Sequence, residues 1–254
     1  MGKISAIIIT KNEAENIGRC LQSLQGVADE LIVLDAFSED ETVEIATSLG
    51  ARVIQREWEG FAASKNFANS QAIHDYILSL DADEELSEKL REAILGVKSS
   101  LTAAYSFNRL TQYAGKWIRH CGWYPDVKLR LFPKEGTQWE GEFVHETLTL
   151  SPEVKMSHLK GDLYHYSIKS VEDHLERINR YTNLSAEEMF QRGKRASWVK
   201  LYLSPFYRFL SMYVLKGGFL DGYAGYQICK ISAFATFLRY AKLREKHRLN
   251  TKEL

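Results

Sequence analysis

Short strand-like runs that alternate with helical patterns constrain the fold of this chain more than any other feature. The runs cover residues 4–10, 31–34, 52–55 and 76–80. Apolar residues at helical spacing fill the intervals and continue after the last run, at residues 13–24, 39–49, 62–72 and 85–97. Strands spaced by helices, with near-continuous apolar runs, indicate a parallel sheet covered on both faces. Ligands bind such sheets at the carboxyl ends of the strands.

One of these strand ends is crowded with carboxylates. The run 76–80 passes directly into Asp81, Ala82, Asp83, Glu84 and Glu85. These acids would repel one another unless a positive charge lies between them, and a divalent cation that holds a diphosphate is the simplest such charge. Asp81 and Asp83 flank one residue, so in an extended chain both point the same way and offer the hard oxygen ligands that Mg²⁺ or Mn²⁺ prefers. The alternative is that the segment is a solvated acidic loop that caps the next helix. In either case we expect Glu84 and Glu85 to start that helix, because acids are favourable near a helix N-terminus.

Other polar segments follow the remaining strands. Lys11, Asn12 and Glu13 come after the first strand, where polar residues can receive a nucleotide or simply cap the next helix, with Asn12 near its N-cap. Asp35 ends the second strand, where a carboxylate can accept hydrogen bonds from a base or ribose. Asp40 and Thr42 after it are also explained as ordinary helix-start residues.

Two further segments carry reactive side chains. Lys65 and Asn66 lie near a predicted helix start and can contact a phosphate, or else belong to a solvated face. The segment "WEGEFVHE" at residues 139–146 closes a short strand with two acids and His145. A carboxylate there can accept a proton from an attacking hydroxyl, and His145 can orient it or bind the metal. A lone histidine is more often structural, so the residues alone leave the role of His145 open.

The second half of the chain changes character. Strand-like segments at 104–110, 127–132 and 163–165 give way to three predicted helices at 171–192, 197–216 and 223–245. We therefore divide the chain into a nucleotide-binding half at 1–100, an acceptor-side half at 101–170 and a helical region at 171–254. Aromatic and basic residues alternate along the last helices, which suits an anionic membrane surface. The same pattern also fits packing against a core or a second copy in a homodimer.

Composition excludes several classes of protein. Lys plus Arg and Asp plus Glu both total 33, so charge does not point to nucleic acid. Three scattered cysteines suit a reducing compartment. We expect no signal peptide and no transmembrane helix, and hence a cytoplasmic protein, at most peripheral on the inner face of the cytoplasmic membrane. Glycine is absent from residues 8–16, which argues against the phosphate loops of nucleotidyltransferases and dinucleotide-dependent oxidoreductases.

The ordered set of motifs resembles the inverting family-2 glycosyltransferases of the GT-A fold. The match is closest to bacterial enzymes that place a β-glucose on heptose in the lipopolysaccharide core. The motifs are "TKNEAENI", "VLDAFSEDET", "ASKNFAN", "LDADEEL", "WYPDVKLRLF", "GEFVHE" and "GGFLDGYAG". The resemblance covers nearly the whole chain and implies an α/β fold, with a mixed, mainly parallel sheet flanked by helices and a C-terminal helical appendage.

The resemblance also implies roles for particular residues. A cation, Mg²⁺ or Mn²⁺, would be held by Asp81 and Asp83, with His145 as a further candidate. The general base would be Glu146, with Glu142 and Asp126 as rivals, because the family's usual Glu-Asp pair is replaced here by His145 and Glu146. The family also often has Arg-Asn at the position of Lys65 and Asn66. The nucleotide sugar would contact Thr10, Lys11, Asn12, Glu13, Asp35, Lys65, Asn66, Asp81, Ala82 and Arg130.

The expected function is transfer of a hexose, glucose first, from a UDP-sugar to a glycan or lipid-linked acceptor such as the lipopolysaccharide core. Two alternatives are a non-catalytic protein that binds sugar nucleotides and a nucleotidyltransferase. The non-catalytic protein would bind nucleotide without turnover, and the presence of both metal acids and a base candidate argues against it.

Overall fold

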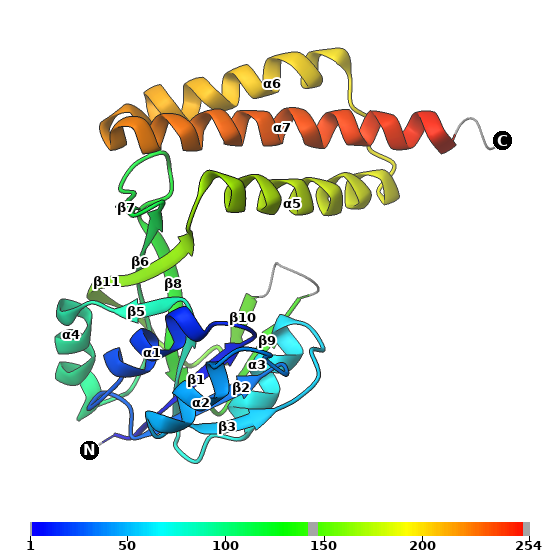
Figure 1. Ribbon diagram of the computed structural model, residues 1–254. Helices are drawn as coiled ribbons and strands as arrows, with labels where there is room; N and C mark the ends of the chain where they lie inside the picture. The colour runs from blue at the N-terminus through cyan, green and yellow to red at the C-terminus, as the bar shows by residue number, and fades with distance from the viewer. Residues whose placement is uncertain (1, 142–146, 251–254) are drawn as a thin grey trace. The chain divides into compact units, whose positions relative to one another are not determined.

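The computed structural model describes residues 2–141 and 147–250, and the chain forms two compact units (Figure 1). The first unit comprises Met1–Leu110 and Asp126–Tyr166, and the second comprises Thr111–Pro125 and Ser167–Leu254. Residues 111–125 therefore group with the helical end of the chain. The division at residues 100 and 170 stays a prediction.

The first unit is built on a mixed sheet whose strand order is β3-β2-β1-β4-β8-β6-β11-β5. Its first four strands are parallel, whereas β8 is antiparallel to β4 and β6, and β5 is antiparallel to β11. The strands that make up this order are β1 (Ile4–Thr10), β2 (Glu30–Asp35), β3 (Arg52–Gln55), β4 (Tyr76–Asp81), β5 (Glu84–Leu86), β6 (Ala104–Tyr113), β8 (Asp126–Pro133) and β11 (Met156–Ile168). A short strand, β7 (Lys116–Trp117), pairs with β6. The strands β9 (Thr137–Glu140) and β10 (Thr147–Leu150) form a separate hairpin. The predicted fold class is confirmed.

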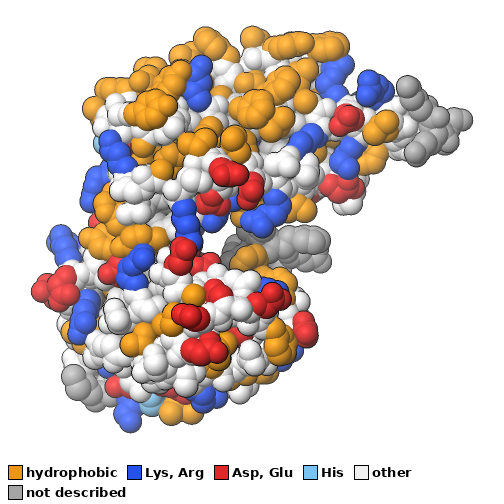
Figure 2. Space-filling model, in the orientation of Figure 1, with side chains coloured by type: hydrophobic (Ala, Val, Ile, Leu, Met, Phe, Trp, Pro, Cys, Tyr) orange, Lys and Arg blue, Asp and Glu red, His pale blue; other side chains and the backbone are white. Residues whose placement is uncertain are grey.

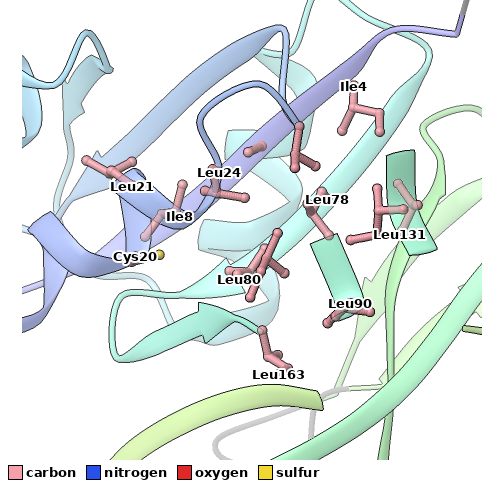
Figure 3. Packing of buried hydrophobic residues seen from close by; sticks show 14 of the residues in the cluster. Ile4, Ile8, Cys20, Leu21, Leu24, Leu78, Leu80, Leu90, Leu131 and Leu163 are labelled. Atoms are coloured by element: carbon pink, nitrogen blue, oxygen red, sulfur yellow. The ribbon is translucent and has the colours of Figure 1, made fainter. Parts of the chain in front are cut away.

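Hydrophobic packing on both faces explains why β1 is apolar throughout. Ile4 and Ile8 belong to one buried cluster, together with residues of α1 and α4, while Ile7 and Ile9 belong to a second cluster with Ala68 of α3. Figure 3 shows the first cluster, in which side chains from β1, β4 and β8 meet those of the helices. The helices of this unit are α1 (Ala14–Ser23), α2 (Thr42–Ser48), α3 (Phe61–Ser70) and α4 (Glu88–Lys98).

The prediction that Glu84 and Glu85 begin a helix is wrong. Both residues lie in β5, and α4 begins at Glu88, where the Ser87 hydroxyl accepts a hydrogen bond of 3.3 Å from the Leu90 amide. Glu84 is 1% exposed, and the side chains of Arg109 and Arg130 compensate the charge of its carboxylate inside the unit. Tertiary charge pairing therefore outweighs the local preference of an acid for a helix start.

The second unit contains, among the residues described, three long helices that match the predicted ones. They are α5 (Val171–Gln191), α6 (Trp198–Leu210) and α7 (Gly222–Asn250), with a π-helical turn η1 (Ser211–Leu215) and a 3₁₀ turn η2 (Gly218–Asp221) between the last two. Ser170 and Ser197 cap α5 and α6 with their hydroxyl groups. Within residues 2–141 and 147–250, no helix is both long and apolar enough to span a bilayer.

The motif "GGFLDGYAG" fixes the start of α7 within this unit. Asp221 is buried and accepts hydrogen bonds from the amides of His120, at 2.8 Å, and Arg119, at 3.3 Å. A Cβ at Gly225 would lie 2.0 Å from the Gly218 carbonyl oxygen, so only glycine permits this approach. Cys121, Cys229 and, in the first unit, Cys20 are buried free thiols, as expected for small packed residues.

Candidate active site

Three neighbouring strands bring three of the predicted site residues to one edge of the sheet. Thr10 at the end of β1 pairs in register with Asp35 at the end of β2, and Ile9 pairs with Asp81 at the end of β4. This register follows from the parallel pairing of the strands, and it brings the nucleotide candidates and the acidic segment together.

Asp81 forms ion pairs with two buried basic side chains, those of Lys65 and Arg130. Its Oδ1 lies 3.4 Å from Lys65 Nζ and its Oδ2 lies 2.7 Å from Arg130 Nη2. Burial by itself would raise the pKa of Asp81, but the charges of Arg130 and Lys65 outweigh burial and hold this pKa well below its usual range. Asp81 is therefore a permanent carboxylate with both oxygens engaged.

Glu84 extends this network of ion pairs to two arginines. Glu84 Oε1 lies 2.8 Å from Arg130 Nη2 and 3.3 Å from Arg109 Nη1, and Arg109 Nη2 lies 2.8 Å from Asp126. Burial lowers the pKa of Arg130, but Asp81 and Glu84 outweigh burial and raise it above its usual value. For Asp81 and Glu84, lysine and arginine side chains supply the positive charge that the sequence alone suggested a metal ion would supply.

Asp83 has a partner that the sequence reasoning missed. Its Oδ2 lies 3.3 Å from His165 Nε2, and both side chains remain partly exposed, at 18% and 13%. The antiparallel pairing of β5 with β11, which sets His165 opposite Glu84, brings this histidine to the site. No spacing in the sequence could reveal that pairing, because the two strands are about eighty residues apart in the chain.

Glu85 has a separate partner. Its Oε2 accepts a hydrogen bond of 2.6 Å from the hydroxyl of Tyr166, whose ring lies 3.8 Å below the guanidinium of Arg19. Burial, together with Glu85, raises the pKa of Tyr166 to about 12. Asp81 and Glu84 thus share Arg130, whereas Asp83 contacts His165 and Glu85 contacts Tyr166.

The loops that follow β1 and β2 are joined by hydrogen bonds. The Asn12 amide donates to Ser38 Oγ at 2.8 Å, and Asn12 Oδ1 accepts from the Glu39 amide at 2.8 Å. Asp35 is fully buried and accepts from the Ser38 amide at 2.9 Å and from Gln55 Nε2 at 3.2 Å. These contacts hold the loops in fixed positions, and the predicted nucleotide roles of Asn12 and Asp35 stay predictions.

The start of α1 is capped from the loop after β2. The Ala14 amide donates to Asp40 Oδ2 at 3.1 Å, and the Glu13 amide donates to Thr42 Oγ1 at 2.8 Å. The N-cap position is Glu13, so Asn12 lies next to the N-cap as expected. The side chains that accept from the first amides are those of Asp40 and Thr42.

Thr10 and Lys11 complete the nucleotide candidates at the end of β1. Thr10 Oγ1 is buried without a hydrogen-bond partner among the described residues, and Lys11 is exposed. Their roles stay predictions.

Asn66 fastens the β9 strand to α3. Its amide donates to the Trp139 carbonyl and accepts from the Trp139 amide, both at 2.8 Å. Lys65 Nζ lies 4.6 Å from the centre of the Trp139 ring. Both polar atoms of the Asn66 side chain are thus used within the protein, and Trp139 is a site neighbour that the sequence reasoning missed.

Part of the predicted site lies outside the described residues. Glu142, His145 and Glu146 belong to that segment, so the base and the histidine stay predictions. Asp126 is described, and its carboxylate contacts Arg109 and, at 3.0 Å, Lys128 Nζ. Ala82 is buried between Asp81 and Asp83.

The described residues offer few ligands for a divalent cation. Within residues 2–141 and 147–250, no group of three His, Cys, Asp or Glu side chains is arranged to hold a metal ion. Asp83 and His165 nevertheless offer one oxygen and one nitrogen donor, and Mg²⁺ or Mn²⁺ at a diphosphate takes its remaining ligands from phosphate and water. Asp83 and His165 fit such an ion better than Asp81, whose oxygens face Lys65 and Arg130.

Sequence comparison places this site in a known family. The model of Glycosyl transferase family 2 matches residues 5–141. An uncharacterised glycosyltransferase of Rickettsia typhi is 35% identical over 96% of this chain and 88% of its own length. The chain therefore belongs to glycosyl transferase family 2 and is a glycosyltransferase. A lipopolysaccharide core biosynthesis glycosyltransferase of Rhizobium meliloti, LpsC, is 28% identical over 98% of this chain and 94% of its own length.

Solved structures give weaker similarities. TarS of S. aureus aligns with 85% of this chain and 45% of its own, at 18% identity and a TM-score of 0.45. Glucosyl-3-phosphoglycerate synthase of Mycobacterium tuberculosis, solved with Mn²⁺, UDP and glucosyl-3-phosphoglycerate, aligns over 44% of each chain at 22% identity and a TM-score of 0.37. Family membership rests on the family model and the curated relatives.

Proposed function

We propose that the protein transfers a hexose, glucose first, from a UDP-sugar to a glycan or lipid-linked acceptor of the lipopolysaccharide-core kind, with inversion at the anomeric carbon. Family membership supports the sugar transfer, and the similarity to LpsC supports the acceptor class. The observation that best supports a donor-binding site here is the pairing of Asp83 with His165. This pair lies just beyond the end of β4, and the neighbouring strands β1 and β2 end at Thr10 and Asp35. The three free buried cysteines support a cytoplasmic location.

The donor would be bound by the edge of the parallel sheet. Thr10, Lys11, Asn12 and Glu13 would line the nucleotide, and Asp35 would hold its uracil or ribose. Lys65 and Arg130 would bring positive charge beneath the diphosphate while they fix Asp81. Asn66 would act through Trp139, since its amide holds that strand in place.

Asp83 and His165 would hold the divalent cation, Mg²⁺ or Mn²⁺. When bound, the ion would offset the charge that develops on the diphosphate leaving group. The partial exposure of both side chains supports this role, because the ligands must remain open to substrate phosphates.

The acceptor hydroxyl would attack the anomeric carbon from the face opposite the nucleotide, and Glu146 would accept its proton. A base of this kind typically contributes about 10²–10⁴-fold to the rate. Asp126 is the less favoured rival because its carboxylate is engaged by Arg109 and Lys128. Glu142 remains the second candidate.

A panel of nucleotide sugars tests this proposal. Each donor is incubated with Mg²⁺ or Mn²⁺ and with lipopolysaccharide truncated in its core, and release of nucleoside diphosphate is measured with the anomeric configuration of the product. UDP-glucose should give the fastest turnover and a β-linked product. Glu146→Gln should retain donor binding and lose turnover, whereas normal turnover in that variant moves the base to Glu142. Nucleotide binding without turnover on any acceptor would favour the non-catalytic alternative.

A further inference from the structure

One face of α6 is an exposed apolar surface with no covering element among the described residues. Figure 2 shows hydrophobic side chains gathered over the helical unit. The members of the face, here called the α6 face, are at least 60% exposed and are Trp198, Val199, Tyr202, Leu203, Phe206 and Tyr207.

The spacing of these residues makes the face continuous. They recur in pairs every four residues, which places them along one side of the helix. Leu201 and Met212 are buried on the other side of the same helical segment, where Met212 packs against Ile228 and Cys229 of α7. One side of the helix therefore packs within its own unit, and the other side exposes apolar side chains that can contact another apolar surface.

The stretch of chain that contains α6 and most of α7 carries exposed charge of a single sign. The sequence contains no acid between Glu188 and Asp221, and Asp221 is buried. After Asp221 the next acid is Glu245. The cations in this interval are Arg192, Lys194, Arg195, Lys200, Arg208, Lys216, Lys230, Arg239, Lys242 and Arg244.

Several cations lie directly beside the aromatic rings. The guanidinium of Arg244 lies 3.7 Å from the ring centre of Trp198, and Lys230 Nζ lies 4.9 Å from that of Phe209. Lys200 and Arg208 are exposed on α6 itself. Rings flanked by cations are the arrangement that suits the boundary between lipid headgroups and acyl chains.

We propose that the α6 face docks the protein on an anionic lipid bilayer. Trp and Tyr favour the bilayer interface, and the surrounding cations match the negative charge of acidic headgroups. A second copy of the chain fits less well, because two such faces would bring lysines and arginines together without an acid to pair with. The face lies wholly in the second unit and is independent of the donor site.

Vesicle flotation of the full chain tests the proposal. The probes are vesicles of phosphatidylcholine alone and vesicles of equal parts phosphatidylcholine and phosphatidylglycerol, at low and high salt. The wild-type protein should float with the anionic vesicles and much less with the neutral ones, and high salt should weaken binding.

Two double variants separate the apolar and charged parts of the α6 face. Trp198→Ser with Phe206→Ser should weaken partitioning by on the order of tenfold for each ring. Lys200→Gln with Arg208→Gln should weaken it by about fivefold for each charge, and only on anionic vesicles. Ile73→Ser with Met156→Ser is the matched control, because both residues are more than 70% exposed in the first unit and outside the α6 face. That control should bind like wild type.

Circular dichroism checks that each variant is folded, and sedimentation without lipid reports the oligomeric state. The proposal is overturned if the folded face variants float like wild type, or if the wild-type protein ignores anionic vesicles. It is also overturned if the wild type is a dimer in solution that the Trp198 and Phe206 substitutions dissociate, while vesicle binding is absent.

Discussion

Arg130 shows how a single residue can determine whether an acidic site is stable. It is 4% exposed and joins two carboxylates, those of Asp81 and Glu84, through one terminal nitrogen. A buried carboxylate that loses its partner keeps the full cost of its desolvation. The arginine therefore stabilises the folded state, whether or not a substrate is bound.

Replacing Arg130 by Met should lower the free energy of unfolding by about 3–5 kcal/mol, because Glu84 is left buried with a weaker partner. Urea denaturation measures the change. Arg109→Met is the matched control, since Arg109 is more exposed and its loss leaves Arg130 on Glu84. Adding Glu84→Gln to Arg130→Met should recover part of the loss, and equal stability of Arg130→Met and wild type would contradict the structural role.

His174 gives a prediction of pH dependence. It is 5% exposed and its ring lies at edge-on distances from Tyr113 and Trp123. Burial lowers the pKa of His174 to about 4, from an ordinary value of 6.5. The unfolded chain therefore binds the proton first as the pH falls, and stability is lost between pH 6.5 and 4, by at most about 3 kcal/mol.

Urea denaturation of wild type and His174→Phe at pH 7 and pH 5 measures this effect. The phenyl ring keeps the aromatic contacts and cannot be protonated, so the variant should lose less stability on acidification than wild type. The same pH dependence in both proteins would show that His174 is not responsible.

The first turns of α1 and α2 share one capping side chain, that of Asp40. Asp40 accepts from the Ala14 amide with one oxygen and from the Thr42 amide, at 3.1 Å, with the other. Asp40→Ala should therefore cost about 1–2 kcal/mol, because one substitution uncaps two helix starts. Thermal unfolding measures the change against Glu39→Ala, whose exposed side chain is adjacent in sequence. A melting temperature as high as that of the control would show that the shared cap contributes nothing.

The elements also show what the sequence can predict. Apolar runs such as residues 4–10 and 76–80 predict β1 and β4 almost to the residue, because burial on both faces leaves a continuous apolar string. Residues 84–86 contain two acids and a leucine, and nothing local marks them as a strand. Their strand exists because Arg130 and Arg109 neutralise Glu84 and because β11 pairs alongside.

At the scale of the whole molecule, the candidate site gathers residues from distant parts of the chain. The motifs pointed to Lys65, Asp81 and Arg130 one by one, and the structure adds that all three form one charge network. His165 lies on β11, a strand of which only residues 163–165 were expected, and only the sheet topology brings it to Asp83. Motifs can thus nominate candidate site residues, whereas the contacts between those residues follow from strand pairing.

The proposed role of Asp83 in holding the donor is tested most directly by calorimetric titration of UDP into the protein with and without Mn²⁺. Wild type and a Glu39→Gln control should bind UDP tightly only with Mn²⁺, and Asp83→Asn should lose at least about tenfold in affinity, since even indirect partners of a metal ligand contribute that much. His165→Gln should lose affinity in the same direction. Equal, Mn²⁺-dependent affinity of wild type and folded Asp83→Asn would contradict the proposed donor site.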